Sequence, residues 1–178
     1  VARGEFCDIA VSQWAGQQLR ADQVELLDRL EHPVRIEVDG FGAVVFCHGT
    51  PRDDDEVVLV DSSMSRWEEV FSSLDDDVST VVCGHTHMPF QRLVDRRLVV
   101  NPGSVGMPYG APGPHWALLR DGVVQLRRTQ VDLDQLAAQV IASSGFPDVT
   151  AWADDYVRTV ASDAEAVAAF GPRDGRSQ

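Results

Sequence analysis

The chain has 178 residues and a formal net charge of −13, from 15 Lys and Arg against 28 Asp and Glu, and 44% of its residues are hydrophobic. This length predicts one domain with a buried core, and the composition excludes a disordered chain. The acidic excess argues against a nucleic-acid surface or an anionic membrane as partner, because both need clustered cations. No apolar run reaches the length of a membrane span, which takes about 18 residues.

Helical spacing of apolar residues predicts helices over residues 8–30, 64–74 and from Leu133 onward. Gly16 divides the first stretch into one interrupted helix or two short ones, and Asp22 is the expected cap of the second. The last residues, 171–178, are expected to form a frayed tail.

Runs rich in β-branched residues predict strands over residues 34–38, 43–47, 79–83, 90–94, 97–101, 115–120 and 123–130. Turns at Asp39-Gly40, Asp95-Arg96 and Asp121-Gly122 would make hairpins of neighbouring strands. This mixture of helices and hairpins predicts two sheets in a layered α/β domain.

The three cysteines, Cys7, Cys47 and Cys83, include no Cys-x-x-Cys pair, and two of them lie in apolar runs. We interpret them as buried thiols of a reducing compartment, which predicts a cytoplasmic location.

Three of the five histidines follow expected strand ends: His48 in "VVFCHG", and His85 and His87 in "VVCGHTH". Loops at the carboxyl ends of strands can converge on one point, and Gly49 and Gly84 would let the backbone turn there. Imidazole binds Zn, Fe, Ni and Mn, so these histidines are candidate metal ligands. The other two histidines, His32 and His115, lie near prolines in expected turns and are interpreted as structural.

The segments "FCHGTPRDDDE", "VVCGHTHMPF" and "VVNPGSVGMP" resemble, in order and spacing, the last motifs of the calcineurin-like metallophosphoesterases, most of all their small bacterial phosphodiesterase branch. The resemblance implies a four-layer αββα sandwich with two divalent metal ions, Mn, Fe, Ni or Zn, between the sheets. It implies that His48 and His85 bind one ion and that His87 binds the other. The implied activity is hydrolysis of small phosphate esters, chiefly phosphodiesters, by water that two metals activate.

Other polar residues of these motifs have two interpretations. Arg52 could bind a substrate phosphate, or it could balance the neighbouring acidic residues 53–55. A run of like charges is typical of a solvated loop, so these carboxylates are not expected to bind metal. Ser104 has no general base near it in sequence and is interpreted as part of a turn, which Asn101 would hold by side-chain hydrogen bonds.

The sequence departs from the family in lacking Asp-x-His, Gly-Asp and Gly-Asn, the motifs that supply the earlier ligands. Imidazoles alone cannot offset two neighbouring dications, because their repulsion needs carboxylates. We therefore expect residues 1–178 to be an N-terminally incomplete single domain, the C-terminal two-thirds of the sandwich. Such a chain would hold one metal ion or none, have little activity alone, and leave sheet edges that favour a homo-oligomer.

Two further functions stay open. The chain could be a non-catalytic scaffold that keeps the fold without a complete metal site, or its histidines could hold a single Zn or Ni ion adventitiously. A β-lactamase-type zinc hydrolase fits less well, because Met88-Pro89 follows His87 where that family has a further Asp-His.

Overall fold

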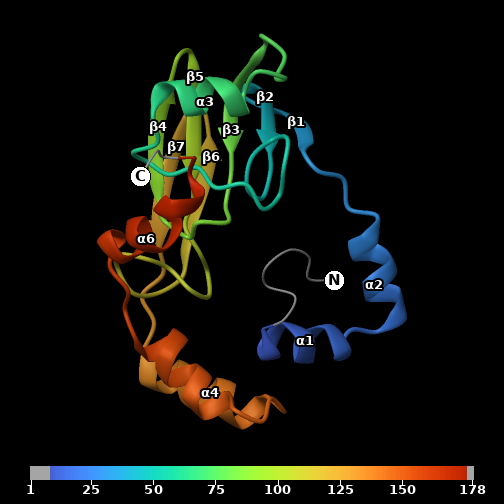
Figure 1. Ribbon diagram of the computed structural model, residues 1–178, viewed down its shortest axis with the longest axis vertical. Coiled ribbons are helices and arrows are strands. Elements are labelled where there is room, and N and C mark those ends of the chain that lie inside the picture. The colour runs from blue at the N-terminus through green and yellow to red at the C-terminus, as the bar shows by residue number, and fades with distance from the viewer. Residues whose placement is uncertain (1–8, 176–178) are drawn as a thin grey trace.

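The computed structural model describes residues 9–175 of the chain. The strands are β1 (Val34–Val38), β2 (Gly42–Phe46), β3 (Val78–Val82), β4 (Phe90–Val94), β5 (Arg97–Asn101), β6 (His115–Arg120) and β7 (Val123–Arg128). The helices are α1 (Ala10–Gln17), α2 (Ala21–Asp28), α3 (Met64–Val70), α4 (Leu133–Ser143), α5 (Val149–Ala153), the π-helix η2 (Asp154–Arg158), α6 (Asp163–Phe170) and the 3₁₀ helix η3 (Gly171–Arg173). Figure 1 shows their arrangement.

A five-stranded sheet with the order β1-β2-β3-β5-β4 forms the centre of the fold. Strands β2, β3 and β5 are parallel to one another, and β1 and β4 flank them as antiparallel edges. Val45, Val81 and Val99 are paired across the three parallel strands and are all buried. The carboxyl ends of β2, β3 and β5 therefore meet at one end of the sheet. A separate hairpin of β6 and β7 forms the second sheet, and the predicted α/β fold class with two sheets is confirmed.

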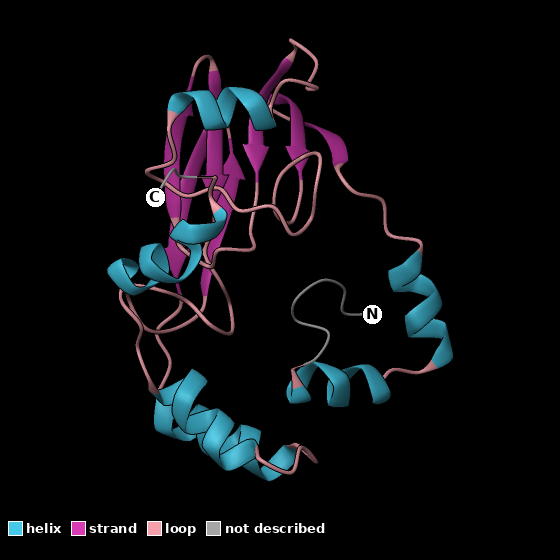
Figure 2. Ribbon diagram, in the orientation of Figure 1, coloured by secondary structure: helices cyan, strands magenta, loops and turns pink. Residues whose placement is uncertain are grey.

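Helix α3 covers one face of the main sheet (Figure 2). Its Trp67 and Val70 are fully buried, and the Trp67 ring lies 5.3 Å from that of Phe71 and 6.4 Å from that of Phe90 on β4. Ser63 caps the helix by accepting a hydrogen bond from the Arg66 backbone. Burial of these large aromatic side chains against a sheet of valines forms the core.

The predicted helical stretch over residues 8–30 forms two short helices, which is one of the two arrangements that the sequence left open. The predicted cap is wrong, because Arg20 precedes α2 and its backbone N–H donates to Gln23, while Asp22 lies in the first turn and pairs with Arg20 at 2.9 Å. Neither helix buries a residue, and Figure 1 shows both set apart from the sheets. The contact of Trp14 with Phe146, at 5.6 Å between ring centroids, joins α1 to the loop after α4.

The hairpins turn where the sequence predicted, and most strand boundaries agree within two residues. Helix α3 ends at Val70, earlier than expected, and its chain continues as a turn. The frayed tail is wrong for the described part of residues 171–178. Residues 171–173 form η3, and the buried Asp174 accepts a hydrogen bond from Ser62 at 2.6 Å. Residues 176–178 and Cys7 lie outside the described residues.

Within residues 9–175 no helix has the length and apolarity needed to cross a membrane. The expected homo-oligomer stays a prediction.

Candidate metal centre

Three loops meet at the carboxyl ends of the parallel strands. His48 follows β2, His85 follows β3, and Asn101 ends β5. The Gly84 backbone N–H donates to the His48 carbonyl at 2.7 Å, and the Asn101 amide donates to the Gly84 carbonyl at 2.8 Å. The structure therefore brings the loops of the two histidine motifs together at one end of the sheet, as the sequence predicted.

Asn101 also organises the loop that follows it. Its side-chain oxygen accepts a hydrogen bond from the Gly103 backbone at 2.9 Å, and its amide reaches the Thr86 hydroxyl at 3.1 Å. The predicted role of Asn101 is confirmed. The Ser104 hydroxyl accepts a hydrogen bond from the Met107 backbone at 3.0 Å, which agrees with its interpretation as a turn residue.

His85 and His87 both have left-handed backbone conformations, with φ of 63° and 55°. A side chain in this region costs about 1–2 kcal/mol, so two of them in three residues store strain. The histidines themselves make the turn that the sequence assigned to Gly84. Gly49 has a different role, because a Cβ there would lie 2.7 Å from the Glu56 carbonyl oxygen. Gly49 is needed because the backbone of residues 53–56 packs against it too closely for a side chain, and its φ is not in the left-handed region.

The imidazoles of His48 and His85 are in contact. Their ring centroids are 5.2 Å apart and their planes are inclined by 63°. The His48 side chain is exposed, whereas His85 is buried and its Nε2 has no hydrogen-bond partner in the described part of the chain. A buried polar nitrogen without a partner costs about 1–3 kcal/mol, and such atoms occur where an ion or ligand binds.

Burial lowers the pKa of His85, and the nearby charges of His48 and Arg173 lower it further, against the opposing effect of Asp55. Burial also lowers the pKa of His87, although a hydrogen bond with the Met107 backbone partly offsets it. Both shifts favour the neutral imidazole over the protonated one. Neutral imidazole is the form that binds metal.

Three features of this region are typical of a metal site: imidazoles that favour the neutral form, a buried nitrogen without a partner, and backbone strain. In the side-chain positions of the described residues, however, no group of three or more His, Cys, Asp or Glu gathers closely enough to hold an ion. His48, His85 and His87 therefore stay candidate ligands, and the described residues do not bring them together as a complete site.

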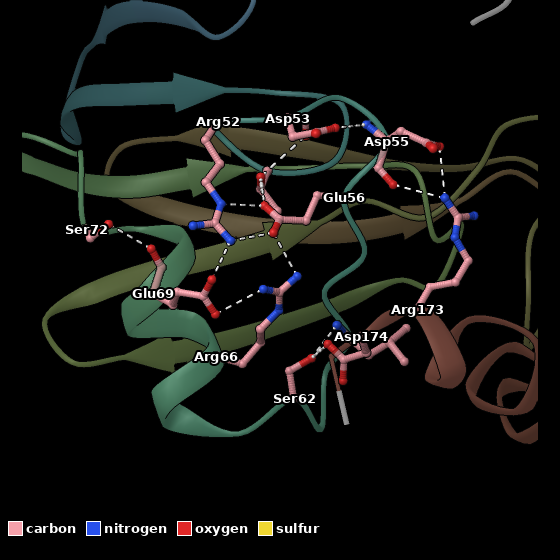
Figure 3. A network of polar contacts seen from close by, with 12 residues as sticks. Arg52, Asp53, Asp55, Glu56, Ser62, Arg66, Glu69, Ser72, Arg173 and Asp174 are labelled. Carbon is pink, nitrogen blue, oxygen red and sulfur yellow. Dashed lines mark hydrogen bonds and ion pairs between the residues drawn. The ribbon is translucent and has the colours of Figure 1, made fainter. Parts of the chain in front are cut away.

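Arg52 lies in a network of ion pairs (Figure 3). It contacts Glu56 at 2.6 Å and Glu69 at 2.8 Å, and Arg66 contacts the same Glu56 at 2.8 Å. The partners of Arg52 are therefore glutamates and not the expected aspartates 53–55. The contact of Arg52 with a substrate phosphate stays a prediction. A phosphate would compete with Glu56 and Glu69 for the Arg52 guanidinium.

The remaining histidines and cysteines have structural surroundings. His32 accepts a hydrogen bond from the His48 backbone at 3.2 Å, and His115 Nε2 lies 2.8 Å from the Ala111 carbonyl oxygen. Cys83 is buried and Cys47 half-buried, and burial raises the pKa of the Cys47 thiol to about 12. Neither thiol is placed to act as a nucleophile at neutral pH.

Sequence reasoning missed two residues beside His85. The Asp55 carboxylate lies 3.5 Å from His85 Nε2 and 3.0 Å from the Arg173 guanidinium. Asp55 was assigned to a solvated loop and Arg173 to a frayed tail. No local pattern could have joined them, because they are 118 residues apart in sequence.

Residues 6–120 match the calcineurin-like phosphoesterase superfamily domain. The chain belongs to this superfamily. Membership suggests metal-dependent hydrolysis of phosphate esters, which agrees with the histidines at the carboxyl ends of β2 and β3 and supports a hydrolase by resemblance.

Solved structures share the fold of this calcineurin-like phosphoesterase. A metallophosphoesterase from Sphaerobacter thermophilus superposes with a TM-score of 0.62 at 21% identity, over 85% of this chain and 71% of the other. The hypothetical protein PH1004 from Pyrococcus horikoshii OT3 superposes with a TM-score of 0.67 at 16% identity, over 90% of this chain and 64% of the other. The chain thus spans about two-thirds of the length of these structures. No curated protein matches its sequence.

Proposed function

We propose that this protein hydrolyses small phosphate esters, chiefly phosphodiesters, at a centre of two divalent metal ions to which His48, His85 and His87 contribute. The observation that carries the proposal is the buried Nε2 of His85, which has no hydrogen-bond partner among the described residues and lies beside the His48 ring. Membership of the calcineurin-like phosphoesterases supports the same chemistry.

In this proposal His48 and His85 hold one ion and His87 holds the other. Divalent ions bound there would polarise the phosphoryl oxygens and lower the pKa of a bound water. The chain's own contribution is positional. Hydrogen bonds from Gly84 and Asn101 hold the loops at fixed separation, and burial keeps the imidazoles neutral. The Ser104 hydroxyl takes part in a turn, and burial raises the pKa of the Cys47 thiol, so attack by water is the consistent route.

The test combines metal content with activity. The protein is loaded with Mn²⁺ or Zn²⁺, dialysed and analysed for metal, and assayed on bis(p-nitrophenyl) phosphate and p-nitrophenyl phosphate. We expect bound metal and faster hydrolysis of the diester. His85→Gln should lose both metal and activity, whereas His115→Gln, which removes an imidazole outside the site, should keep them. Hydrolysis that is unchanged in His85→Gln would contradict the proposal.

Two observations favour a second candidate function, a binding scaffold without catalysis. No three donor side chains converge in the described residues, and the Phe170 ring lies against His85 at 5.9 Å between centroids. A scaffold would be folded, would retain no metal after dialysis and would hydrolyse neither ester. The same experiment therefore separates the two functions.

A further inference from the structure

The C-terminal segment, residues 163–174, lies next to His85. Figure 1 shows α6, in red, at the end of the sheet toward which β2 and β3 run. The Phe170 ring contacts both His85 and Tyr109, with centroid distances of 5.9 Å and 6.2 Å. Beyond it, Arg173 reaches the loop after β2, where it contacts Asp55 (Figure 3).

Asp55 Oδ1 lies between two groups of different character. On one side the Arg173 guanidinium contacts it at 3.0 Å and also donates to the Asp55 backbone oxygen at 3.1 Å. On the other side it faces His85 Nε2 at 3.5 Å. The His85 side chain is only 8% exposed, and its nitrogen, which has no hydrogen-bond partner among the described residues, faces a carboxylate that is 39% exposed.

His85 Nε2 and Asp55 Oδ1 are 3.5 Å apart and do not form a hydrogen bond, although both atoms are polar. Two ligands on one tetrahedral zinc-like ion, with bonds of about 2.1 Å, are separated by roughly 3.4 Å. The observed 3.5 Å is close to this separation, so the two atoms can donate to one ion with little movement of either side chain.

Resting on the proposed function, we propose that Asp55 is a carboxylate ligand of the metal ion bound by His85. In the absence of metal, Arg173 neutralises this carboxylate, and the ion competes with the guanidinium for it. An Asp55 ligand would supply the negative charge that three imidazoles lack, which reduces the repulsion between two neighbouring divalent ions. It would also give the buried His85 nitrogen a partner.

Arg173 is then a positioning residue that acts through Asp55. Its ion pair is partly exposed, with side-chain exposures of 25% for Arg173 and 39% for Asp55. Partly exposed pairs are weak, so a divalent ion can displace the guanidinium. Removing Arg173 should therefore increase metal affinity, which a purely structural contact would not do.

The experiment measures Zn²⁺ affinity by competition with a chromophoric chelator, and Co²⁺ binding by its visible absorption spectrum. Asp55→Asn should weaken Zn²⁺ binding at least about tenfold and change the Co²⁺ spectrum. Asp54→Asn is the matched control, because it removes the same charge from the neighbouring exposed position. Arg173→Gln should tighten binding about two- to fivefold, whereas Arg120→Gln, a change of the same charge at an exposed hairpin residue, should not. The double variant Asp55→Asn/Arg173→Gln should bind like Asp55→Asn alone.

Circular dichroism and the melting temperature show which variants are folded, and only folded variants are compared. Equal affinity of Asp55→Asn and Asp54→Asn, with His85→Gln impaired, would overturn the role of Asp55 and leave the proposed function standing. Weaker binding in Arg173→Gln than in Arg120→Gln would overturn the competition. Absence of Zn²⁺ binding by the unmodified protein would overturn both the inference and the proposed function.

Discussion

The side-chain amide of Asn101 donates a hydrogen bond to the Gly84 carbonyl at 2.8 Å, and so joins the end of β5 to the loop that carries His85. Asn101 is only 1% exposed, and its other bonds reach Thr86 and Gly103. One buried side chain therefore fixes the positions of two loops around the candidate metal centre.

Asn101→Ala should lower the free energy of unfolding by about 1–3 kcal/mol, because it leaves the Gly103 N–H without its partner and removes one of the two hydrogen bonds to the Gly84 carbonyl, which also accepts from the Thr86 backbone. It should also weaken metal binding, since the loops lose their fixed separation. Urea denaturation and chelator competition measure the two effects. Gln139→Ala, at an exposed position of α4, is the control and should change neither. Unchanged stability of Asn101→Ala would contradict this role.

The strain at His87 predicts an unusual order of stability. With φ of 55°, position 87 should be more stable as Gly than as Ala by about 0.5–1 kcal/mol, because Gly avoids the left-handed penalty but is more flexible when unfolded. Both variants lack the imidazole, so the comparison isolates the backbone. Gln139→Gly and Gln139→Ala in helix α4 should show the opposite order. Thermal unfolding of the four variants tests this. A variant with Ala at position 87 that is as stable as, or more stable than, the variant with Gly would show that His87 is not strained.

The Glu56 network predicts loss of stability in acid. Burial raises the pKa of this carboxyl, but hydrogen bonds from Arg52 and Thr50 and the charge of Arg66 outweigh it and lower the pKa to about 2. A lowered pKa stabilises the fold above the unfolded value of 4.5, and this contribution disappears as pH falls toward 2. It amounts to roughly 3 kcal/mol, reduced by the exposure of Arg52.

Glu56→Gln should therefore be less stable than the unmodified protein at pH 7, and the difference should shrink between pH 4.5 and 2. Urea midpoints at several pH values measure it. Glu37→Gln on the exposed edge strand β1 is a control that should show a much smaller change. A difference that is constant with pH would contradict the predicted ionisation.

The hydrogen bond between Ser62 and Asp174 predicts how the C-terminal segment is held. Both residues are buried, and Ser62 also accepts from the Leu59 backbone at 2.7 Å. Ser62→Ala should lower stability by about 1–3 kcal/mol and make the segment after α6 more sensitive to proteolysis. Ser143→Ala on the exposed end of α4 should do neither. Equal rates of cleavage in the two variants would contradict the role of Ser62.

Local sequence patterns predicted the strands and hairpins because burial of alternate or consecutive side chains leaves a periodic record in the sequence. Strands β4 and β5 begin and end where the pattern placed them. The metal-ligand candidates were visible for a similar reason, since a histidine directly after an apolar strand lies at the end of a sheet. The cap of α2 was missed because the backbone of Arg20, and not a short polar side chain, makes the hydrogen bond there.

By itself, the sequence determined the fold class, the family motifs and the end of the sheet at which the loops of His48, His85 and His87 lie. Only the tertiary structure decided that Asp55 and Arg173 lie beside His85, that Arg52 pairs with glutamates, and that two histidines carry the strained turn. The physical reason is the range of the interactions. Periodicity reports whether a residue is buried, whereas the partner of a charge depends on which distant segments the topology brings together.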